Sequence, residues 1–76
     1  MIDFVPDVPR WLQVHAEILR RIKAGDYAPR TRVPSVVQLQ EEFGIAGATA
    51  QKVHRQLRAD GMIYTVPGMG SFVSPQ

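Results

Sequence analysis

The first strong pattern in the chain is a set of large, mostly apolar side chains at helical spacing. They occupy positions i, i+3, i+4, i+7 and i+11: Trp11, Val14, His15, Ile18 and Ile22. This spacing places them on one face of an amphipathic helix. Because Pro9 suits the first turn of a helix and Gly25 suits the residue that follows one, we expect this helix to run from about residue 10 to residue 24.

A shorter apolar stripe follows after a loop that contains two prolines. Val36, Leu39 and Phe43 form the stripe, and it lies between Ser35 and Gly44. Serine is a good N-cap residue, and glycine readily adopts the left-handed conformation that ends a helix. The pattern therefore predicts a second helix over residues 36–43.

A third helix is expected from about residue 48 to residue 60, with Gly61 just after it. Its inward face would carry Ala50, Val53, His54 and Leu57, and its outward face would carry Thr49, Gln51, Lys52, Arg55 and Arg58. We interpret His54 as a histidine of the core or its rim, not as a ligand. The connection between the second and third helices, residues 44–47, has the length of a helix-turn-helix turn.

The end of the chain reads as a β-hairpin. Apolar and polar side chains alternate well enough over residues 62–66 for a strand, and residues 71–73 would form the returning strand of the hairpin. Pro67, Gly68 and Gly70 form the bend. Ile63 and Phe72 are expected in the core. Three helices followed by a hairpin give a mainly α fold with a small β-hairpin, in the order of a winged helix-turn-helix. Arg32 and Val33 could form a very short third strand.

The chain of 76 residues is long enough for one small domain with one modest core. We assign residues 10–73 to this domain, residues 1–9 to an extended lead-in and residues 74–76 to a tail. The chain contains no cysteine and only two histidines, so neither disulfides nor a zinc cluster is expected. No apolar run approaches the length of about 20 residues that crosses a bilayer. We expect a cytoplasmic protein without metal or cofactor.

The charged residues are unevenly distributed. The net charge is only +2, but every lysine and arginine lies between Arg10 and Arg58. The positive net charge and its distribution give modest support for a polyanionic partner. No close carboxylate pair, activated nucleophile or phosphate-binding loop is recognisable, so an enzyme is the poorest interpretation.

From Pro9 to Val73 the sequence resembles the N-terminal DNA-binding domain of the GntR family of bacterial regulators. No single motif carries this resemblance; the order and spacing of many positions do. The matching positions are Pro9, Trp11, Val14, Ile18, Ile22, Gly25, Pro34, Ser35, Leu39, Phe43, Thr49, Leu57, Gly61, Met62, Ile63, Gly68, Gly70, Phe72 and Val73.

The departures from the family pattern fall mostly on the side that would face DNA. Arginine or another basic residue is usual in the family at four places where this chain has Val37, Gly47, Gln51 and Met69. The family turn usually has a serine directly before the arginine that Gly47 replaces, and here that position is Ala46. Elsewhere, Gln40 stands where a small alanine is usual, His54 where leucine is usual, and Arg30 where a loop glycine is usual.

The resemblance implies sequence-specific binding of double-stranded DNA by a transcription regulator, more often a repressor. The third helix would enter the major groove, and the wing would contact the adjacent backbone or minor groove. The candidate DNA-binding residues are Arg32, Ser35, Gly47, Ala48, Thr49, Gln51, Lys52, Arg55, Arg58, Gly68, Met69 and Gly70. Gln51 suits adenine, and Arg55 suits guanine or a phosphate. Arg58 is expected to lie too far along the helix for a base.

The resemblance also leads us to expect a homodimer on a two-fold operator. Family members usually carry a C-terminal domain that binds a small ligand and dimerises, so this chain is either part of a longer regulator with such an effector domain or a minimal regulator without a ligand sensor. An alternative is a winged-helix module that has lost DNA binding and contacts protein through an apolar tip at Met69. Lys52 and Arg55 would then be an ordinary solvated helix face.

Overall fold

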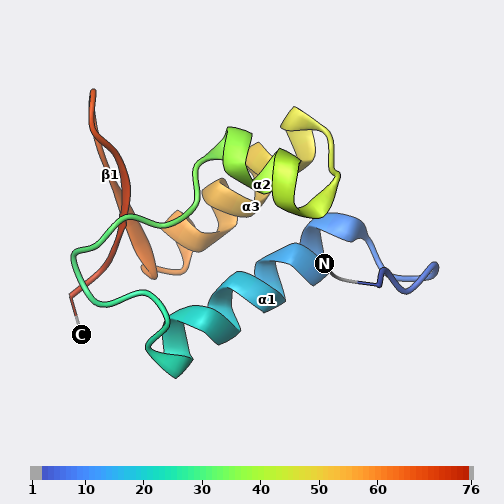
Figure 1. Ribbon diagram of the computed structural model, residues 1–76, viewed down its shortest axis with the longest axis horizontal. Helices are drawn as coiled ribbons and strands as arrows, with labels where there is room; N and C mark the ends of the chain where they lie inside the picture. The colour runs from blue at the N-terminus through green and yellow to red at the C-terminus, as the bar shows by residue number, and fades with distance from the viewer. Residues whose placement is uncertain (1–2, 76) are drawn as a thin grey trace.

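The computed structural model describes residues 3–75, so residues 1–2 of the expected lead-in and residue 76 of the tail lie outside the described part. It contains three helices, α1 (Arg10–Ala24), α2 (Val36–Phe43) and α3 (Gly47–Ala59), and two strands, β1 (Ile63–Val66) and β2 (Gly70–Val73) (Figure 1). The predicted mainly α fold with a C-terminal hairpin is confirmed. Among the helices only α3 differs in its bounds: it begins and ends one residue earlier than expected. β1 begins one residue later, and β2 one residue earlier, than the expected strands.

The ends of α1 follow from its flanking residues. Gly25 has φ of 84°, and its N–H donates to the carbonyl of Ile22, while the N–H of Asp26 donates to that of Arg21. Such bonds satisfy carbonyls that a helix end leaves without intrahelical donors. Val14, Ile18 and Ile22 are buried, as the apolar spacing predicts.

The start of α2 is fixed by a reciprocal pair of hydrogen bonds. The Ser35 hydroxyl accepts from the Gln38 N–H at 3.1 Å, and the Gln38 side-chain oxygen accepts from the Ser35 N–H at 2.8 Å. This capping box satisfies two backbone donors that would otherwise have no partner. It also explains why the start of so short a helix is well defined.

Replacing Ser35 by alanine should therefore destabilise the domain by about 1 kcal/mol, the usual effect of removing an N-cap side chain. Urea unfolding followed by circular dichroism measures the change. Ser35→Gly provides the comparison, because glycine is a tolerated N-cap residue and costs only a few tenths of a kcal/mol. Equal stability of wild type and Ser35→Ala would show that the capping box is energetically unimportant.

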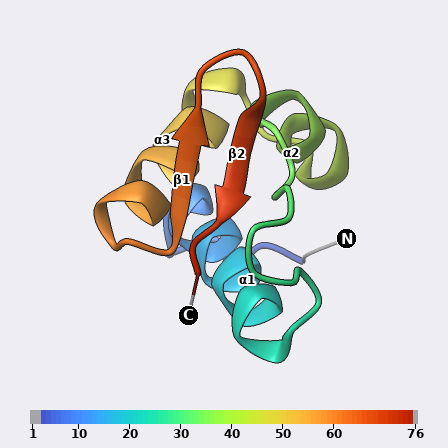
Figure 2. The ribbon, with the colours of Figure 1, turned by 90° about the vertical axis from the view of Figure 1, so that its left-hand side faces the viewer.

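The hairpin is antiparallel, with Ile63 opposite Val73 and Tyr64 opposite Phe72 (Figure 2). The expected third strand is reduced to a single bridge between Arg32 and Phe72, flanked by backbone hydrogen bonds that join residues 30–33 to residues 71–73. The hairpin is thus attached to the loop before α2. This attachment supplies support that a two-stranded hairpin lacks on its own.

The expectation that Phe72 lies in the core is wrong. Ser71 and Val73 point inward and are buried, so Phe72, between them, points to the other face because strand side chains alternate. There it is half-buried and stacks on Tyr64, with ring centroids 5.8 Å apart. Ile63, in contrast, is buried as predicted.

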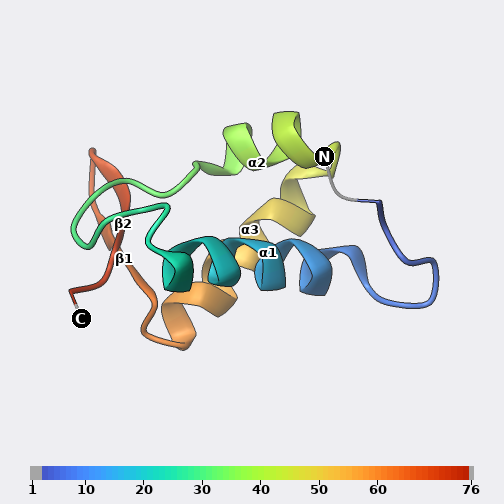
Figure 3. The same cartoon turned by 60° about the horizontal axis from the view of Figure 1, so that its bottom comes forward.

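The hairpin and the N-terminal segment lie at opposite ends of the helices, as Figures 1 and 3 both show. The segment before α1 packs on the domain. The Gln13 side chain accepts a hydrogen bond from the Val5 N–H and donates to the carbonyls of Val5 and Val8, and Phe4 packs against the core. The lead-in is therefore tied to the first helix.

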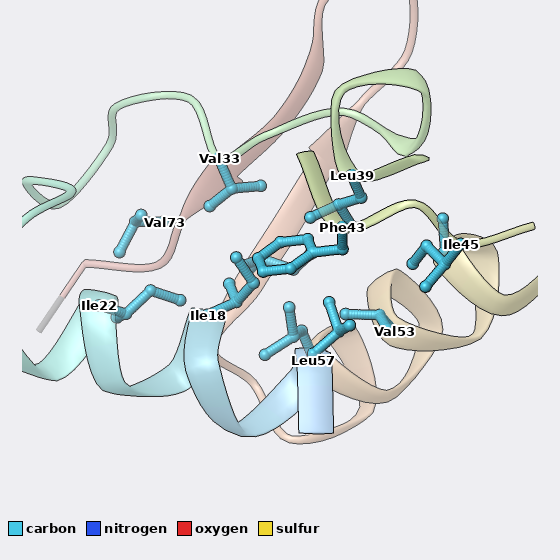
Figure 4. Packing of buried hydrophobic residues seen from close by; sticks show 12 residues of the cluster. Ile18, Ile22, Val33, Leu39, Phe43, Ile45, Val53, Leu57 and Val73 are labelled. Carbon is cyan, nitrogen blue, oxygen red and sulfur yellow. The ribbon is translucent and has the colours of Figure 1, made fainter. Parts of the chain in front are cut away.

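One hydrophobic core joins all five elements (Figure 4). Its buried apolar members are Val14, Ile18, Ile22, Val33, Leu39, Phe43, Ile45, Ala50, Val53, Leu57, Ile63 and Val73. Phe43 of α2 points toward Ile18 of α1 and Leu57 of α3, so the three helices share a common centre. Within residues 3–75, no helix is long and apolar enough to cross a membrane.

Candidate nucleic-acid interface

The N-terminal end of α3 is formed by small residues and is not capped by a side chain. The first backbone bond of the helix runs from the Ala50 N–H to the Ala46 carbonyl, at 3.0 Å, and Ala46 makes no side-chain cap bond. The N–H groups of residues 47–49 therefore have no acceptor within the described part of the chain. Donors of this kind, at the positive end of a helix dipole, suit an anionic group such as phosphate. Ala46 and Ala48 are exposed, and no bulky side chain keeps a partner at a distance.

The N-cap residue of α3 explains why the helix starts one residue earlier than predicted. Ala46 is extended, with φ of −70° and ψ of 157°, and acts as the N-cap residue. Alanine is a poor N-cap residue, so the sequence contains no signal for the boundary.

Gln51, Lys52 and Arg55 are all exposed on α3. Arg55 has no hydrogen bond or ion pair within residues 3–75, and its guanidinium group is therefore available. The Lys52 ammonium lies 4.7 Å from the centre of the Trp11 ring, a cation–π contact between α3 and α1. Lys52 is thus positioned by the first helix.

The Trp11–Lys52 contact has no counterpart in the sequence prediction, which placed Trp11 simply in the core. Trp11 is half-buried at the edge of the core and lies edge-on to His15, with ring centroids 6.2 Å apart. Residues 11 and 52 belong to different helices, so helical spacing cannot reveal their contact. The same holds for His15, which bonds Asp60 at 3.0 Å beyond the end of α3.

Arg58 is directed toward the hairpin. Its Nη1 donates to the Thr65 hydroxyl of β1 at 3.3 Å, and that hydroxyl also bonds Ser71 of β2 at 3.0 Å. Arg58 is exposed, yet it is tied to the wing instead of the outer surface of the first turns of α3.

Arg32 lies beside the wing. Its guanidinium carbon is 5.9 Å from the centre of the Phe72 ring, and its Nε lies 3.8 Å from the position that a Cβ on Gly70 would occupy. The exposed Arg32 is therefore packed along the outer face of the hairpin and close to its tip.

The wing tip is a tight turn. The Met69 N–H donates to the Val66 carbonyl at 3.0 Å, with Pro67 and Gly68 between them. Proline followed by a glycine with φ of 78° is typical of a type II turn. The Met69 N–H closes this turn, so it is not available to a partner. The Met69 side chain is 55% exposed.

These features gather on one side of the molecule. In Figures 1 and 2 the hairpin tip, α2 and the start of α3 lie on the same side, and the C-terminal end of α1 lies on the opposite side.

Ser35, at the start of α2, uses its hydroxyl oxygen to accept from the Gln38 N–H, which leaves the hydroxyl hydrogen available to a further acceptor.

The two arginines near the end of α1 are paired with carboxylates. Arg20 and Arg21 both donate to Glu17, and Arg21 also pairs with Glu42 of α2. Hydrogen bonds from Arg20 and Arg21 lower the pKa of Glu17 from its ordinary 4.5 to about 2. Arg32, Lys52, Arg55 and Arg58 form no ion pair within residues 3–75, so the positive charge of α3 and the wing is not neutralised in this way.

His54 occupies a buried position, as predicted, and links α3 to the loop before α2. Its Nε2 lies 2.7 Å from the Pro34 carbonyl and donates to it in the neutral tautomer with the proton on Nε2. Burial lowers the pKa of His54 below its ordinary 6.5, and the charge of Arg58 acts in the same direction, while the Pro34 bond opposes them. His54 therefore has a structural role, and its buried position disfavours the protonated form of its ring.

The free energy of unfolding should fall as the pH drops below about 6.5, because the unfolded chain then binds a proton that folded His54 resists. His54→Leu should reduce this dependence, since leucine cannot titrate. Urea unfolding of both proteins at pH 7.5 and pH 5.5 measures the difference. Glu17 does not interfere, because its stabilising effect is lost only as the pH falls below about 4.5. Identical pH dependences would show that His54 is not the responsible group.

Within residues 3–75, no group of three or more His, Asp or Glu side chains lies close enough together to hold a metal ion. The arrangement instead offers a surface: backbone donors at the start of α3, exposed polar and cationic side chains on its first turns, and a protruding hairpin. Such a surface can approach an extended polyanion.

Comparison with known proteins agrees with this description. The chain is 35% identical over 66 residues to the histidine utilization repressor of Pseudomonas putida, covering 87% of this chain and 27% of that protein. Over 67 residues it is 31% identical to the repressor NagR of Bacillus subtilis, covering 88% of this chain and 28% of that protein. The chain therefore spans about a quarter of the length of these relatives.

Solved structures share the fold closely. A GntR family transcriptional regulator from Listeria monocytogenes has a TM-score of 0.91 and 26% identity, covering 96% of this chain and 64% of that one. The DNA-binding domain of AraR, solved in complex with operator ORR3, has a TM-score of 0.85 and 30% identity, covering 97% of this chain and 89% of that one. The fold is thus the winged helix of these regulators.

The sequence model described as "Bacterial regulatory proteins, gntR family" matches residues 11–73, which is most of the chain. The chain belongs to the GntR family of bacterial regulatory proteins.

Proposed function

We propose that this chain binds double-stranded DNA sequence-specifically and is the operator-binding module of a transcriptional repressor. The observation that carries the proposal is the close similarity, over nearly its whole length, to a domain solved on its operator. The relatives named as repressors support the direction of regulation. Its setting would be the cytoplasm of a bacterium, and its role would be binding and not catalysis.

In the proposed complex the N-terminal end of α3 enters the major groove. Small residues there permit close approach, and the free N–H groups of residues 47–49 meet a phosphate. Gln51 suits the adenine edge, and Thr49 and Ala48 suit a thymine methyl group. Arg55 contacts guanine or a phosphate, and Lys52, steadied by Trp11, contacts the backbone.

The wing and the start of α2 would bind the flanking backbone. Arg32 lies along the hairpin and close to Gly70, so both can reach the same phosphate strand. The Ser35 hydroxyl can donate to a phosphate while it caps α2. Arg58, which lies beside β1, would contribute positive charge near the DNA backbone. Gly68 and Met69 would form the wing tip that contacts the adjacent groove.

The proposed domain comprises residues 10–73, preceded by the lead-in and followed by the short tail. A surface with so few arginines should give weak binding by one copy. We therefore propose that two copies bind a two-fold operator and that a further domain of the full regulator pairs them and responds to an effector. Sedimentation of the complex with a selected operator should give two chains per duplex; one chain per duplex would contradict the pairing.

Fluorescence anisotropy of a labelled random duplex tests the DNA-binding proposal. The affinity should fall with rising salt, with a slope of log affinity against log salt of roughly −3 to −4 per chain, since Arg32, Lys52, Arg55 and Arg58 would neutralise up to four phosphates. The fluorescence of Trp11, the one tryptophan of the sequence, should also change on binding, because Lys52 lies over its ring. No binding even at low salt would favour the protein-binding alternative, for which the exposed Val37 and Met69 would be the contact residues.

A further inference from the structure

The start of α3 carries no side chain longer than threonine. Residues 46–49 are Ala, Gly, Ala and Thr, so the end of the helix that would enter the groove offers methyl groups, one hydroxyl and backbone donors. Strong discrimination between bases comes from paired hydrogen bonds to a base edge. The first turn of α3 cannot supply such a pair itself.

A side chain of α2 that can form such a pair of hydrogen bonds lies beside the first turn of α3. Gln40 is half-buried, and its side-chain amide lies against Gly47. Three of its atoms, Nε2, Cδ and Oε1, lie 3.5, 3.6 and 3.6 Å from the position that a Cβ on Gly47 would occupy. Because the three distances are nearly equal, the flat face of the amide covers Gly47, and its oxygen and nitrogen lie along the edge.

The polar atoms of this amide are unused. Gln13, Gln38 and Gln56 all employ their side-chain amides in hydrogen bonds, whereas that of Gln40 has no partner within residues 3–75. No buried side-chain nitrogen or oxygen in the described part lacks a partner. The Gln40 oxygen and nitrogen therefore reach solvent, beside the open N–H groups of α3.

We propose that Gln40 reads a base. Delivered from α2 across Gly47, its amide would accept from the N6 amino group and donate to N7 of an adenine in the major groove. This inference rests on the proposed DNA binding and adds a specificity residue outside α3. Gly47 leaves room for this approach, since a Cβ at this position would already be in contact with the amide.

Selection of binding sites from a random duplex pool tests the proposal, with wild type, Gln40→Met, Gln40→Ala and Gln51→Met compared. Methionine has a similar length but cannot form the paired hydrogen bonds. Both Gln40 variants should lose the preference for adenine at one base pair of the site, and Gln51→Met should lose it at a different one. The affinity of Gln40→Met for the wild-type site should fall about tenfold, while its affinity for random DNA stays unchanged.

The matched control is Gln56→Met, the same substitution at a half-buried glutamine near the far end of α3. It should select the wild-type site. Thermal melting confirms that each variant is folded, and Gln40→Ala introduces the smaller side chain if methionine proves too bulky. An unchanged site with the Gln40 variants would overturn this inference alone. Failure of wild type to select any site would overturn the DNA-binding proposal as well.

Discussion

Replacing both Lys52 and Arg55 by alanine should lower the affinity for duplex DNA by about 3 kcal/mol, or roughly 100-fold, if each residue makes one good contact. The salt slope should become shallower by about 2, because two fewer phosphates would be neutralised. Anisotropy titrations at several salt concentrations measure both quantities. The effect should be large because Arg55 has no internal partner in the described chain and Lys52 has only the Trp11 ring.

The control for this variant removes the same charges from the opposite side of the molecule. Arg20→Ala/Lys23→Ala lowers the net charge equally but acts at the end of α1, where Arg20 is already paired with Glu17. Its affinity should change by less than about threefold, a general charge effect. If the two double variants weaken binding equally, DNA attraction depends on net charge and not on α3.

Leu57→Ala should destabilise the fold by about 3 kcal/mol, because it removes a large side chain from the centre of the core. Leu57 is 1% exposed and lies beside Ile18 and Val53 (Figure 4). A domain of this length has a total stability of roughly 4–11 kcal/mol, so the variant should lose between about a quarter and about three quarters of it. The midpoint of thermal unfolding should fall by roughly 12–24 °C.

The same substitution at a surface position provides the control. Leu12 is 42% exposed on α1, and Leu12→Ala should change the free energy of unfolding by less than about 0.5 kcal/mol. A loss at Leu12 as large as that at Leu57 would mean that the outer face of α1 is covered in solution. Similar stability of Leu57→Ala and wild type would contradict the described core.

Most of the architecture could be predicted from the sequence because local signals mark it. The bounds of α1 and α2 agree with the structure, since Pro9, Gly25, Ser35 and Gly44 mark helix ends through their own backbone preferences. The start of α3 differs from the prediction by one residue because Ala46 has no such preference. Local chemistry therefore limits how precisely a boundary can be predicted.

Contacts between elements could not be predicted in this way. Whether Phe72 or its neighbours face the core depends on the register of β2 against β1, which spacing in a four-residue strand does not determine. The placement of Lys52 over Trp11 and of Gln40 against Gly47 depends on how helices pack. The contacts proposed with DNA, at α3 and at the wing, stay predictions.

The most direct test of the DNA-binding surface is a titration of the isotopically labelled chain with a short duplex, followed by backbone amide chemical shifts. We expect the largest changes at residues 46–52 and 55, smaller ones at residues 32–37 and 68–70, and little change at residues 16–24. Shifts centred on residues 12–24, or the absence of any shift at low salt, would contradict the account that α3 and the wing form the surface that binds DNA.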